Sequence, residues 1–170
     1  MKQGWFFIVL MLLVCSVPVY GEHTSPWKLD DLTGFPAPDF NLATLDGKSY
    51  TLADFRGRVI FLNFWTTWCP PCREEIPDLN ELSKKYNKKD FVIVAISTDI
   101  SPRTLTDFLK KYPVEYLVLH DPESKAARNY KAYSLPASFL IDRNGKIVER
   151  FLGSEKWMGR DFLKKIDSLL

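Results

Sequence analysis

Cysteine and histidine, two of the residues that most often bind metals, are scarce in this chain. Its 170 residues include 3 cysteines and 2 histidines, and the histidines, His23 and His120, stand far apart. A zinc site normally takes four protein ligands, or three and a water molecule. We therefore expect no metal centre, and no cofactor is indicated. So few cysteines also exclude a fold held by several disulfides, which means that an apolar core must stabilise the domain.

An excess of charge of one sign is also missing. Lysine and arginine number 23 and aspartate and glutamate 21, which leaves a net charge of +2. A protein that binds nucleic acid or an anionic membrane surface is expected to carry a larger basic excess. Neither partner is therefore expected. The chain also shows no internal repeat and no low-complexity tract.

The one long apolar run lies at the N-terminus. Residues 5–19 are almost wholly apolar, Lys2 precedes them, and Gly21 offers a small residue for cleavage. This pattern is typical of a secretory signal peptide that is cut after Gly21. A retained membrane anchor and lipid attachment at Cys15 are the alternatives, but the run is shorter than the ~20 apolar residues that a bilayer-spanning helix needs. The predicted segments are a signal peptide or membrane anchor over residues 1–21, a linker over 22–34 and one domain over 35–170.

The other two cysteines form the motif Trp68-Cys69-Pro70-Pro71-Cys72, whose spacing alone fits either a redox disulfide or half of a metal site. The apolar run at residues 59–65 is rich in β-branched and aromatic residues and predicts a buried strand. After the motif, apolar residues recur at helical spacing over residues 73–85. The cysteines thus lie where a strand gives way to a helix, and the unpaired N–H groups and dipole of a helix start favour a thiolate. We interpret the pair as a redox dithiol.

Each residue of the motif has an expected part in that chemistry. Cys69 is nearest the helix start and is the expected nucleophile, and Cys72, one turn further in, is the expected resolving thiol. A purely structural bridge is disfavoured because so short a loop removes little unfolded-state entropy when it is closed. Pro70 and Pro71 remove N–H donors and restrict φ, so we expect them to tune the redox properties. Trp68 is expected to cover the motif and contact partners, with a core tryptophan as the alternative.

The remaining pattern predicts strands and helices in alternation. Asp46-Gly47 and Asp142-Arg143-Asn144-Gly145 are hairpin signals, and Pro77 is expected to kink the helix after the motif. Strands are expected over residues 40–42, 49–52, 59–65, 91–97, 114–119, 138–141 and 146–151. Helices are expected over residues 73–85, 102–112, 123–130 and 156–170. This order describes an α/β protein with a mixed sheet covered on both faces.

The order of elements, together with the motif, resembles the thioredoxin fold. More narrowly, the chain resembles the extracytoplasmic thiol-disulfide oxidoreductases of the TlpA/ResA group from about Phe35 to its C-terminus. The segments that carry the resemblance are Ala37-Pro38-Asp39-Phe40, Asn63-Phe64-Trp65-Thr66-Thr67 before the motif, Arg73-Glu74-Glu75-Ile76-Pro77 after it, Leu135-Pro136 and Ile141-Asp142-Arg143-Asn144-Gly145. The resemblance implies a thioredoxin-like fold, with a central mixed β-sheet flanked by helices, an N-terminal β-hairpin extension and an inserted βα element.

The resemblance also implies roles outside the cysteine motif. ResA-like proteins have a glutamate at the position of Glu75, whereas thioredoxins commonly carry a buried aspartate where this chain has Asn63. A partly buried carboxyl at Glu75 would have a raised pKa and would pass protons to or from Cys72, although a helical glutamate faces solvent by default. Pro136 matches the cis-proline that faces the active site in this fold. In that role Leu135 would offer its backbone to an incoming peptide.

The activity that the resemblance implies is electron exchange with protein cysteines through the CPPC dithiol or disulfide. Most members of the group are reductants that reduce particular proteins, for example in cytochrome c maturation. The implied partners are cysteine-containing protein substrates and a membrane-bound electron donor. The implied location is the bacterial periplasm or the outer face of the membrane.

Two other functions stay open at this point. One is a thiol peroxidase of the peroxiredoxin-like group, since the segment 37–40 also occurs in peroxiredoxins and Thr66 lies three residues before Cys69. Against it, Leu62 stands where such an enzyme has proline. The other is a copper-handling thiol protein, because two thiolates suit Cu(I), but a third ligand is missing.

Overall fold

The centre of the protein is a mixed β-sheet. The structure, a computed structural model, describes residues 32–86 and 89–170, so the predicted signal segment and most of the predicted linker lie outside the described residues. In those two ranges the sheet has seven strands in the order β2-β1-β5-β4-β3-β6-β7. The strands are β1 (Asn41–Ala43), β2 (Ser49–Thr51), β3 (Val59–Trp65), β4 (Phe91–Ser97), β5 (Leu117–His120), β6 (Ala137–Ile141) and β7 (Ile147–Leu152). The helices are the 3-10 helix η2 (Leu52–Phe55), α1 (Pro70–Glu74), α2 (Ile76–Tyr86), α3 (Pro102–Lys111), α4 (Lys125–Asn129) and α5 (Arg160–Leu169).

Three parallel strands form the middle of the sheet. β3 pairs with β4 and β4 with β5 in parallel, while β6 runs antiparallel to β3. All seven residues of β3 are buried, as expected of a strand covered on both faces. Trp65 stands opposite Ser97, and Phe64 opposite Ala137. The ends of β3 and β4 and the start of β6 therefore meet at one edge of the sheet, and the cysteine motif follows β3 at this edge.

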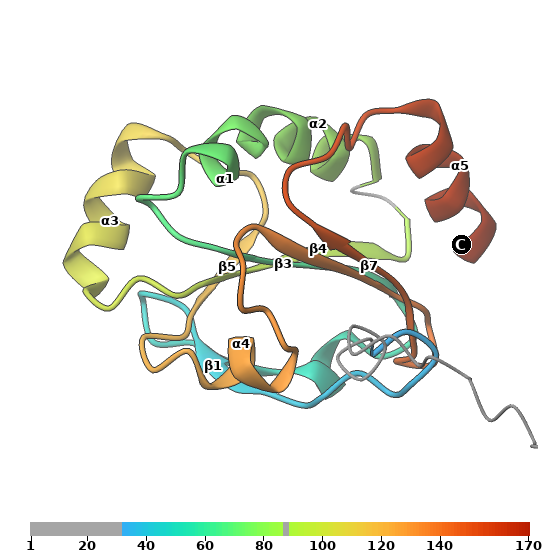
Figure 1. The fold of residues 1–170 in the computed structure, drawn as a ribbon, viewed down its shortest axis with the longest axis horizontal. Coiled ribbons are helices and arrows are strands. Elements are labelled where there is room, and N and C mark those ends of the chain that lie inside the picture. The colour runs from blue at the N-terminus through green and yellow to red at the C-terminus, as the bar shows by residue number, and fades with distance from the viewer. Residues whose placement is uncertain (1–31, 87–88) are drawn as a thin grey trace, which may run out of the picture.

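Helices cover both faces of the sheet, with α1, α2 and α5 above it in Figure 1 and α4 below it. Side chains of β3 alternate between the two faces. The core of the upper face contains Val59, Phe61, Leu79, Leu82, Tyr86, Ile93, Leu140, Trp157, Phe162 and Ile166. The core of the lower face contains Ile60, Leu62, Phe64, Val94, Ile96, Ala126, Ala127, Tyr130, Phe139 and Ile141. This layered α/β core holds the end of β3, and hence the motif, in a rigid frame.

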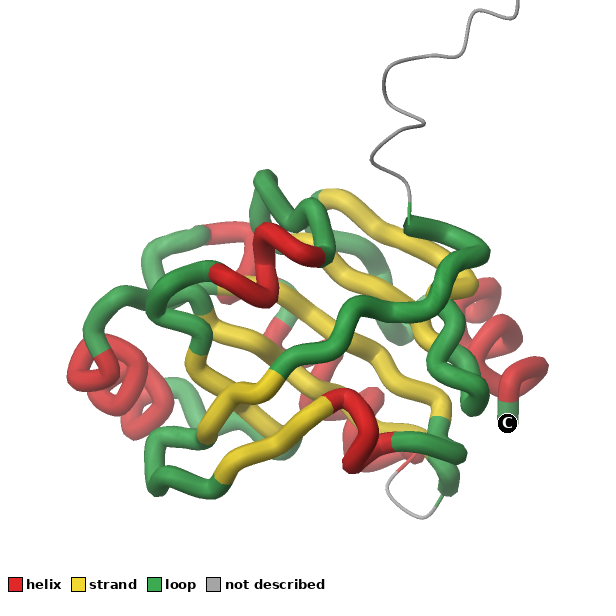
Figure 2. Tube along the Cα trace, turned by 90° about the horizontal axis from the view of Figure 1, so that it is seen from below, coloured by secondary structure: helices red, strands yellow, loops and turns green. Residues whose placement is uncertain are grey.

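An N-terminal segment and a hairpin complete the lower face. The chain before β1 crosses this face of the sheet (Figure 2), and Leu32, Ala37 and Phe40 pack against or within its core. β1 and β2 then form an antiparallel hairpin in which Gly47 has a φ of 87°, a left-handed conformation that favours glycine. β5 and α4 form the inserted βα element between α3 and β6. The expected thioredoxin-like fold, with both additions, is confirmed.

The helix after the motif is broken at Glu75. A single helix was expected over residues 73–85, but α1 and α2 are separate, and α1 begins at Pro70. Pro77 has no N–H to donate to the carbonyl of Arg73, and the N–H of Glu75 donates there instead. Helical bonding resumes when the N–H of Leu79 donates to the carbonyl of Glu75 at 3.0 Å. The expected kink is therefore present, and Glu75 lies in it.

Two other elements begin three or more residues later than predicted, for local reasons. β5 begins at Leu117, not at residue 114, because the side chain of Asn80 accepts the N–H of Glu115 at 2.8 Å and holds this segment against α2. α5 begins at Arg160, not at residue 156. Trp157 consequently lies in the loop before α5, where it is fully buried.

Candidate active site

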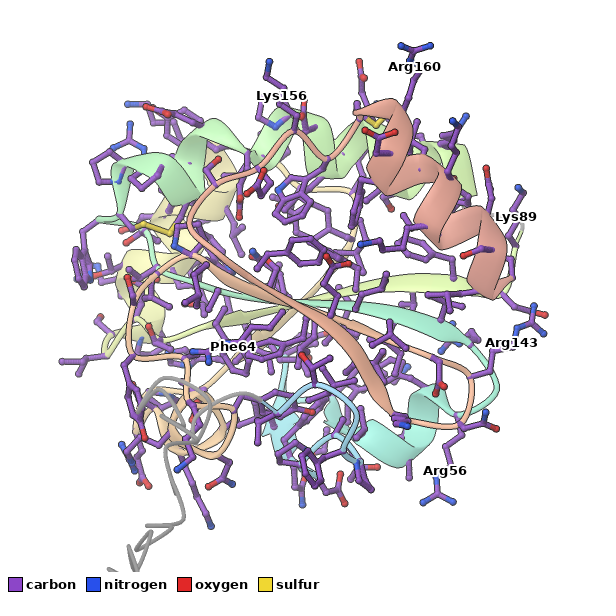
Figure 3. The ribbon with its side chains drawn as sticks, turned by 45° about the vertical axis from the view of Figure 1, so that its right-hand side comes forward. Arg56, Phe64, Lys89, Arg143, Lys156 and Arg160 are labelled. Carbon is purple, nitrogen blue, oxygen red and sulfur yellow. A yellow bond between two sulfur atoms is a disulfide. The ribbon has the colours of Figure 1, made fainter. Side chains whose placement is uncertain are left out.

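Cys69 and Cys72 form a disulfide at the edge of the sheet where β3 ends. Their sulfur atoms are 2.11 Å apart and their Cα atoms 5.3 Å apart, and Figure 3 shows the sulfur–sulfur bond beside the first turn of α1. Both side chains are largely enclosed, with 5 % of Cys69 and 2 % of Cys72 exposed. They pack with Trp65, Ala95 and Leu105. The pair that the sequence predicted is thus joined, and Cys69 is its more exposed member.

Cys69 is the N-cap residue of α1. Its backbone is extended, and its Sγ accepts a hydrogen bond from the N–H of Cys72 at 3.3 Å. Pro70 and Pro71 fill the first two helical positions and have no N–H. The N–H of Cys72 is therefore the first donor that α1 offers, and it points to the sulfur of Cys69. In the reduced protein the same donor and the helix dipole favour the thiolate of Cys69.

Glu75 points into the protein from the junction of α1 and α2. Only 3 % of the residue is exposed. Its Oε1 accepts a hydrogen bond from Nδ2 of Asn63 at 2.8 Å, and its Oε2 accepts one from Nε1 of Trp157 at 2.9 Å. Nδ2 of Asn63 also donates to Oγ of Ser138 at 3.0 Å. Both carboxyl oxygens are thus held by uncharged donors, so the default expectation of a solvent-facing glutamate is wrong here.

Burial raises the pKa of Glu75 to about 7. Loss of hydration is the largest cause, and the nearby negative charge of Asp78 adds to it, while the hydrogen bonds from Trp157 and Asn63 oppose it. Burial, together with the negative charge of Glu75, also raises the pKa of Tyr116. A carboxyl group with a pKa near neutrality can both accept and release a proton at physiological pH.

The segment before β6 brings a cis-proline to the same edge of the sheet. The Leu135–Pro136 peptide bond is cis, and Pro136 is buried. Leu135 packs against the cluster that contains both cysteines. Trp68 is 74 % exposed, which excludes the alternative of a core tryptophan. Trp68 borders the disulfide because it precedes Cys69 directly, and Leu135 borders it through its packing against the cysteine cluster.

Three polar partners of the site were missed by the sequence analysis. Trp157 falls within the helix expected over residues 156–170, and Ser138 within the strand expected over residues 138–141, and neither was predicted to contact the site. Asp99 is buried two residues after β4 and accepts hydrogen bonds from Thr66 and Thr67, which lie just before the motif. Its place after the carboxyl end of a parallel strand is a signal that could have identified it, because functional groups collect at that edge of a parallel sheet.

Across residues 32–86 and 89–170, no group of three or more histidine, cysteine, aspartate or glutamate side chains is arranged to hold a metal ion. None of the helices in that part of the chain is long and apolar enough to cross a bilayer. His120, the one described histidine, contacts the carbonyl oxygen of Asp99 through Nε2 at 2.6 Å.

Comparison with known proteins identifies the family. A family model described as Redoxin matches residues 32–167. The chain belongs to the Redoxin family. This Redoxin chain is 40 % identical to the thiol-disulfide oxidoreductase ResA of Bacillus anthracis over 171 residues, which cover 97 % of this chain and 98 % of that relative. It is 32 % identical to ResA of Bacillus subtilis (strain 168) over 148 residues, covering 86 % and 82 % of the two chains.

A solved structure is similar to this Redoxin chain in the same way. A thiol:disulfide interchange protein of the thioredoxin family from Chlorobium tepidum TLS has a TM-score of 0.70 to this chain and 29 % sequence identity, over 82 % of this chain and 98 % of that one. The protein is therefore a ResA-like thiol-disulfide oxidoreductase, and the resemblance read from the motif is confirmed. The roles of the individual site residues remain predictions.

Proposed function

We propose that the protein is an extracytoplasmic reductant of disulfides in other proteins, with Cys69 as nucleophile and Cys72 as resolving thiol. The observation that carries the proposal is the Cys69–Cys72 disulfide at the start of α1, with the N–H of Cys72 directed at Sγ of Cys69 at 3.3 Å. A thiolate at Cys69 is stabilised there, and it is the sulfur of the pair that a partner meets first. The reducing direction rests on the resemblance to the ResA group.

The proposed exchange moves two electrons from the dithiol to the partner. The thiolate of Cys69 attacks one sulfur of a partner disulfide, that S–S bond breaks, and the leaving sulfur takes up a proton. The thiol of Cys72 then loses its proton, and its thiolate attacks Sγ of Cys69 in the mixed disulfide. The mixed disulfide breaks, the second partner sulfur leaves and is protonated, and the Cys69–Cys72 disulfide closes. The partner ends with two thiols, and the protein with the disulfide that the structure contains.

Glu75 is the proposed acceptor of the Cys72 proton. It lies three residues after Cys72, so the two share one side of the helical turn. Its pKa of about 7 leaves a useful fraction ionised at neutral pH, and its other neighbours, Asn63 and Trp157, donate to its oxygens. In the reverse half-reaction the protonated carboxyl returns the proton to Cys72.

Partner contacts are proposed for the residues that border the disulfide. Trp68 offers an exposed indole beside the nucleophile, and aromatic side chains of this kind supply large contact areas in interfaces. Leu135, which packs against the cluster that contains both cysteines, is proposed to present its backbone to an extended partner segment, with Pro136 beside it. Pro70 and Pro71 are proposed to tune the redox potential through the donors that they remove from the helix start.

The proposed partners are a cysteine-containing protein substrate and a membrane-bound electron donor. The apolar run at residues 5–19 after Lys2 supports export, because it is typical of a signal peptide or anchor. An exported dithiol is not maintained by the cytosolic thiol pool, so it needs a donor in the membrane. An apocytochrome c is the proposed substrate class, since its C-x-x-C-H motif binds haem through two cysteines that must first be reduced.

Replacing Cys72 by serine is expected to trap the first intermediate. The reduced variant, mixed with an oxidised peptide containing Cys-x-x-Cys-His, should form a mixed disulfide at Cys69 that Cys72 can no longer resolve, and quenching with acid stops the freed peptide thiol from reversing the step. Mass spectrometry of the intact protein measures it as one added peptide. The Cys69→Ser/Cys72→Ser double variant is the control and should gain no peptide within residues 35–170, where it has no cysteine. Absence of the adduct on the single variant, or its location at another residue, would refute Cys69 as nucleophile.

A further inference from the structure

Asp99 is a buried carboxylate directly beside the segment that leads to the nucleophile. It follows β4, and only 3 % of it is exposed. Its Oδ1 accepts hydrogen bonds from Oγ1 of Thr66 at 2.8 Å and from Oγ1 of Thr67 at 2.7 Å. Its Oδ2 accepts the backbone N–H of Thr67 at 3.0 Å and Oγ of Ser97 at 2.8 Å. Four donors thus compensate a carboxylate whose burial is otherwise costly.

These hydrogen bonds connect Asp99 to Cys69 through Thr66 and Thr67. Thr66 and Thr67 are the residues between the end of β3 and the motif, and the carbonyl of Thr66 accepts the N–H of Cys69 at 3.3 Å. One side chain therefore binds both residues of the turn, and that turn binds the backbone of the nucleophile.

Asp99 is itself held from two further strands. Its N–H donates to Oγ of Ser97 at 3.1 Å, at the end of β4. Its carbonyl oxygen lies 2.6 Å from Nε2 of His120, at the end of β5. A carbonyl only accepts, so Nε2 is the nitrogen that carries the hydrogen. The N–H of Asp121, also after β5, donates to the carbonyl of Ser97 at 2.8 Å. The end of the inserted β5 strand thus supports the backbone of Ser97 and Asp99.

We propose that Asp99 is a positioning residue of the redox site, which fixes the turn at Thr66 and Thr67 so that Sγ of Cys69 is presented to the partner disulfide. The proposal rests on the proposed function of Cys69 as nucleophile. It also gives the inserted β5 strand a role, because His120 holds the backbone of Asp99 in place. Misplacement of a reacting atom by about 1 Å can lower a rate by as much as a hundredfold, so this support has kinetic consequences.

Asp121 provides a matched control. It is also a buried aspartate, with 2 % exposed, and its carboxylate accepts the backbone N–H groups of Lys125 at 2.9 Å and Ala127 at 3.1 Å. It therefore caps α4 and has no bond to Thr66 or Thr67. Asp121→Asn and Asp99→Asn remove the same charge from a buried site, but only Asp99→Asn disturbs the turn before Cys69.

The test combines two measurements on the full-length protein. In Asp99→Asn one of the two oxygens that accept hydrogen bonds is replaced by an NH₂ group, which only donates. The variant is expected to lower the rate at which the reduced protein reduces an oxidised Cys-x-x-Cys-His peptide by about threefold or more. It is also expected to accelerate amide hydrogen exchange at Thr67 and Cys69 by about tenfold, the effect of losing a hydrogen bond worth roughly 1.4 kcal/mol. Asp121→Asn should leave both quantities within about twofold of wild type, even where its thermal stability falls.

A double-mutant cycle separates positioning from general destabilisation. Thr67→Val removes one hydroxyl donor to Asp99, so its combination with Asp99→Asn should lower the rate of peptide reduction little beyond the larger single effect. When Thr67→Val is combined with Asp121→Asn, the effects of the two substitutions on the rate of peptide reduction should multiply. The proposal would be overturned if the effects of Asp99→Asn and Thr67→Val on the rate of peptide reduction multiplied. It would also be overturned if Asp99→Asn and Asp121→Asn had equal rates of peptide reduction and of amide hydrogen exchange. Should wild type fail to reduce the peptide, the proposed function fails, while the amide exchange still decides whether Asp99 holds the turn.

Discussion

The Cys69→Ser variant is expected to reduce protein disulfides at least about a thousandfold more slowly than wild type, the scale of loss found when a catalytic nucleophile is removed. A serine hydroxyl is not ionised at neutral pH and cannot form a disulfide, so the helix start that stabilises the Cys69 thiolate has nothing to act on. The measurement is the rate at which the pre-reduced protein opens an oxidised Cys-x-x-Cys-His peptide.

Cys72→Ser distinguishes the two roles in the same assay. It should open the peptide once, at a rate near that of wild type, and then stop at the mixed disulfide. A Cys69→Ser variant that opens the peptide once and stops at a mixed disulfide on Cys72, with an inactive Cys72→Ser variant, would reverse the assignment of nucleophile and resolving thiol. Hydrogen peroxide consumption by reduced wild type that outpaced peptide reduction would instead favour the peroxidase alternative.

Glu75→Gln is expected to remove most of the pH dependence of the free energy of unfolding of the disulfide form. Glu75 titrates at about 7 in the folded protein against 4.5 in a solvated chain. Between these values the folded state binds more protons than the unfolded state, so stability falls as the pH rises through 7. At 1.36 kcal/mol per pKa unit, wild type should lose about 2 to 3 kcal/mol from this group between pH 5 and pH 8. Glutamine cannot ionise and should lose none.

Urea unfolding of the oxidised protein at the two pH values measures this difference. The control is Glu74→Gln, at the exposed neighbouring position, which should keep the dependence of wild type. The same Glu75→Gln variant should also flatten the pH profile of thiol reactivity in the reduced protein, because the proposed acceptor of the Cys72 proton is absent. Equal pH dependence of stability in Glu75→Gln and Glu74→Gln would contradict the buried titration, and an unchanged reactivity profile would remove Glu75 from the mechanism.

The sequence was most informative where the signal is local. The apolar run before the motif predicts β3 because a strand buried on both faces needs continuous apolar residues. Pro77 predicts the break between α1 and α2, because proline has no N–H to donate to the carbonyl of the fourth residue before it. The redox interpretation of Cys69 and Cys72 rested on their place at a strand–helix junction, on the export signal and on the shortage of other metal ligands.

The remaining features depend on contacts between distant segments. A cis X-Pro bond occurs at about 5–6 % of such positions, so Pro136 was identified through the family resemblance alone. The inward orientation of Glu75 depends on Trp157, which is 82 residues away and lies outside the last helix. Asp99 meets Thr66 across 33 residues, and it does so only because β3 and β4 end at the same edge of the sheet. Patterns along one segment do not encode these pairings.

The reduction potential of the Cys69–Cys72 couple tests the central claim most directly. The protein would be equilibrated with dithiol and disulfide buffers of known potential, and its free thiols quantified by alkylation and mass spectrometry. The proposed reductant should behave as one two-electron couple with a potential far below about −200 mV. A potential near about −120 mV, the range of a strong oxidant of thiols, would contradict it.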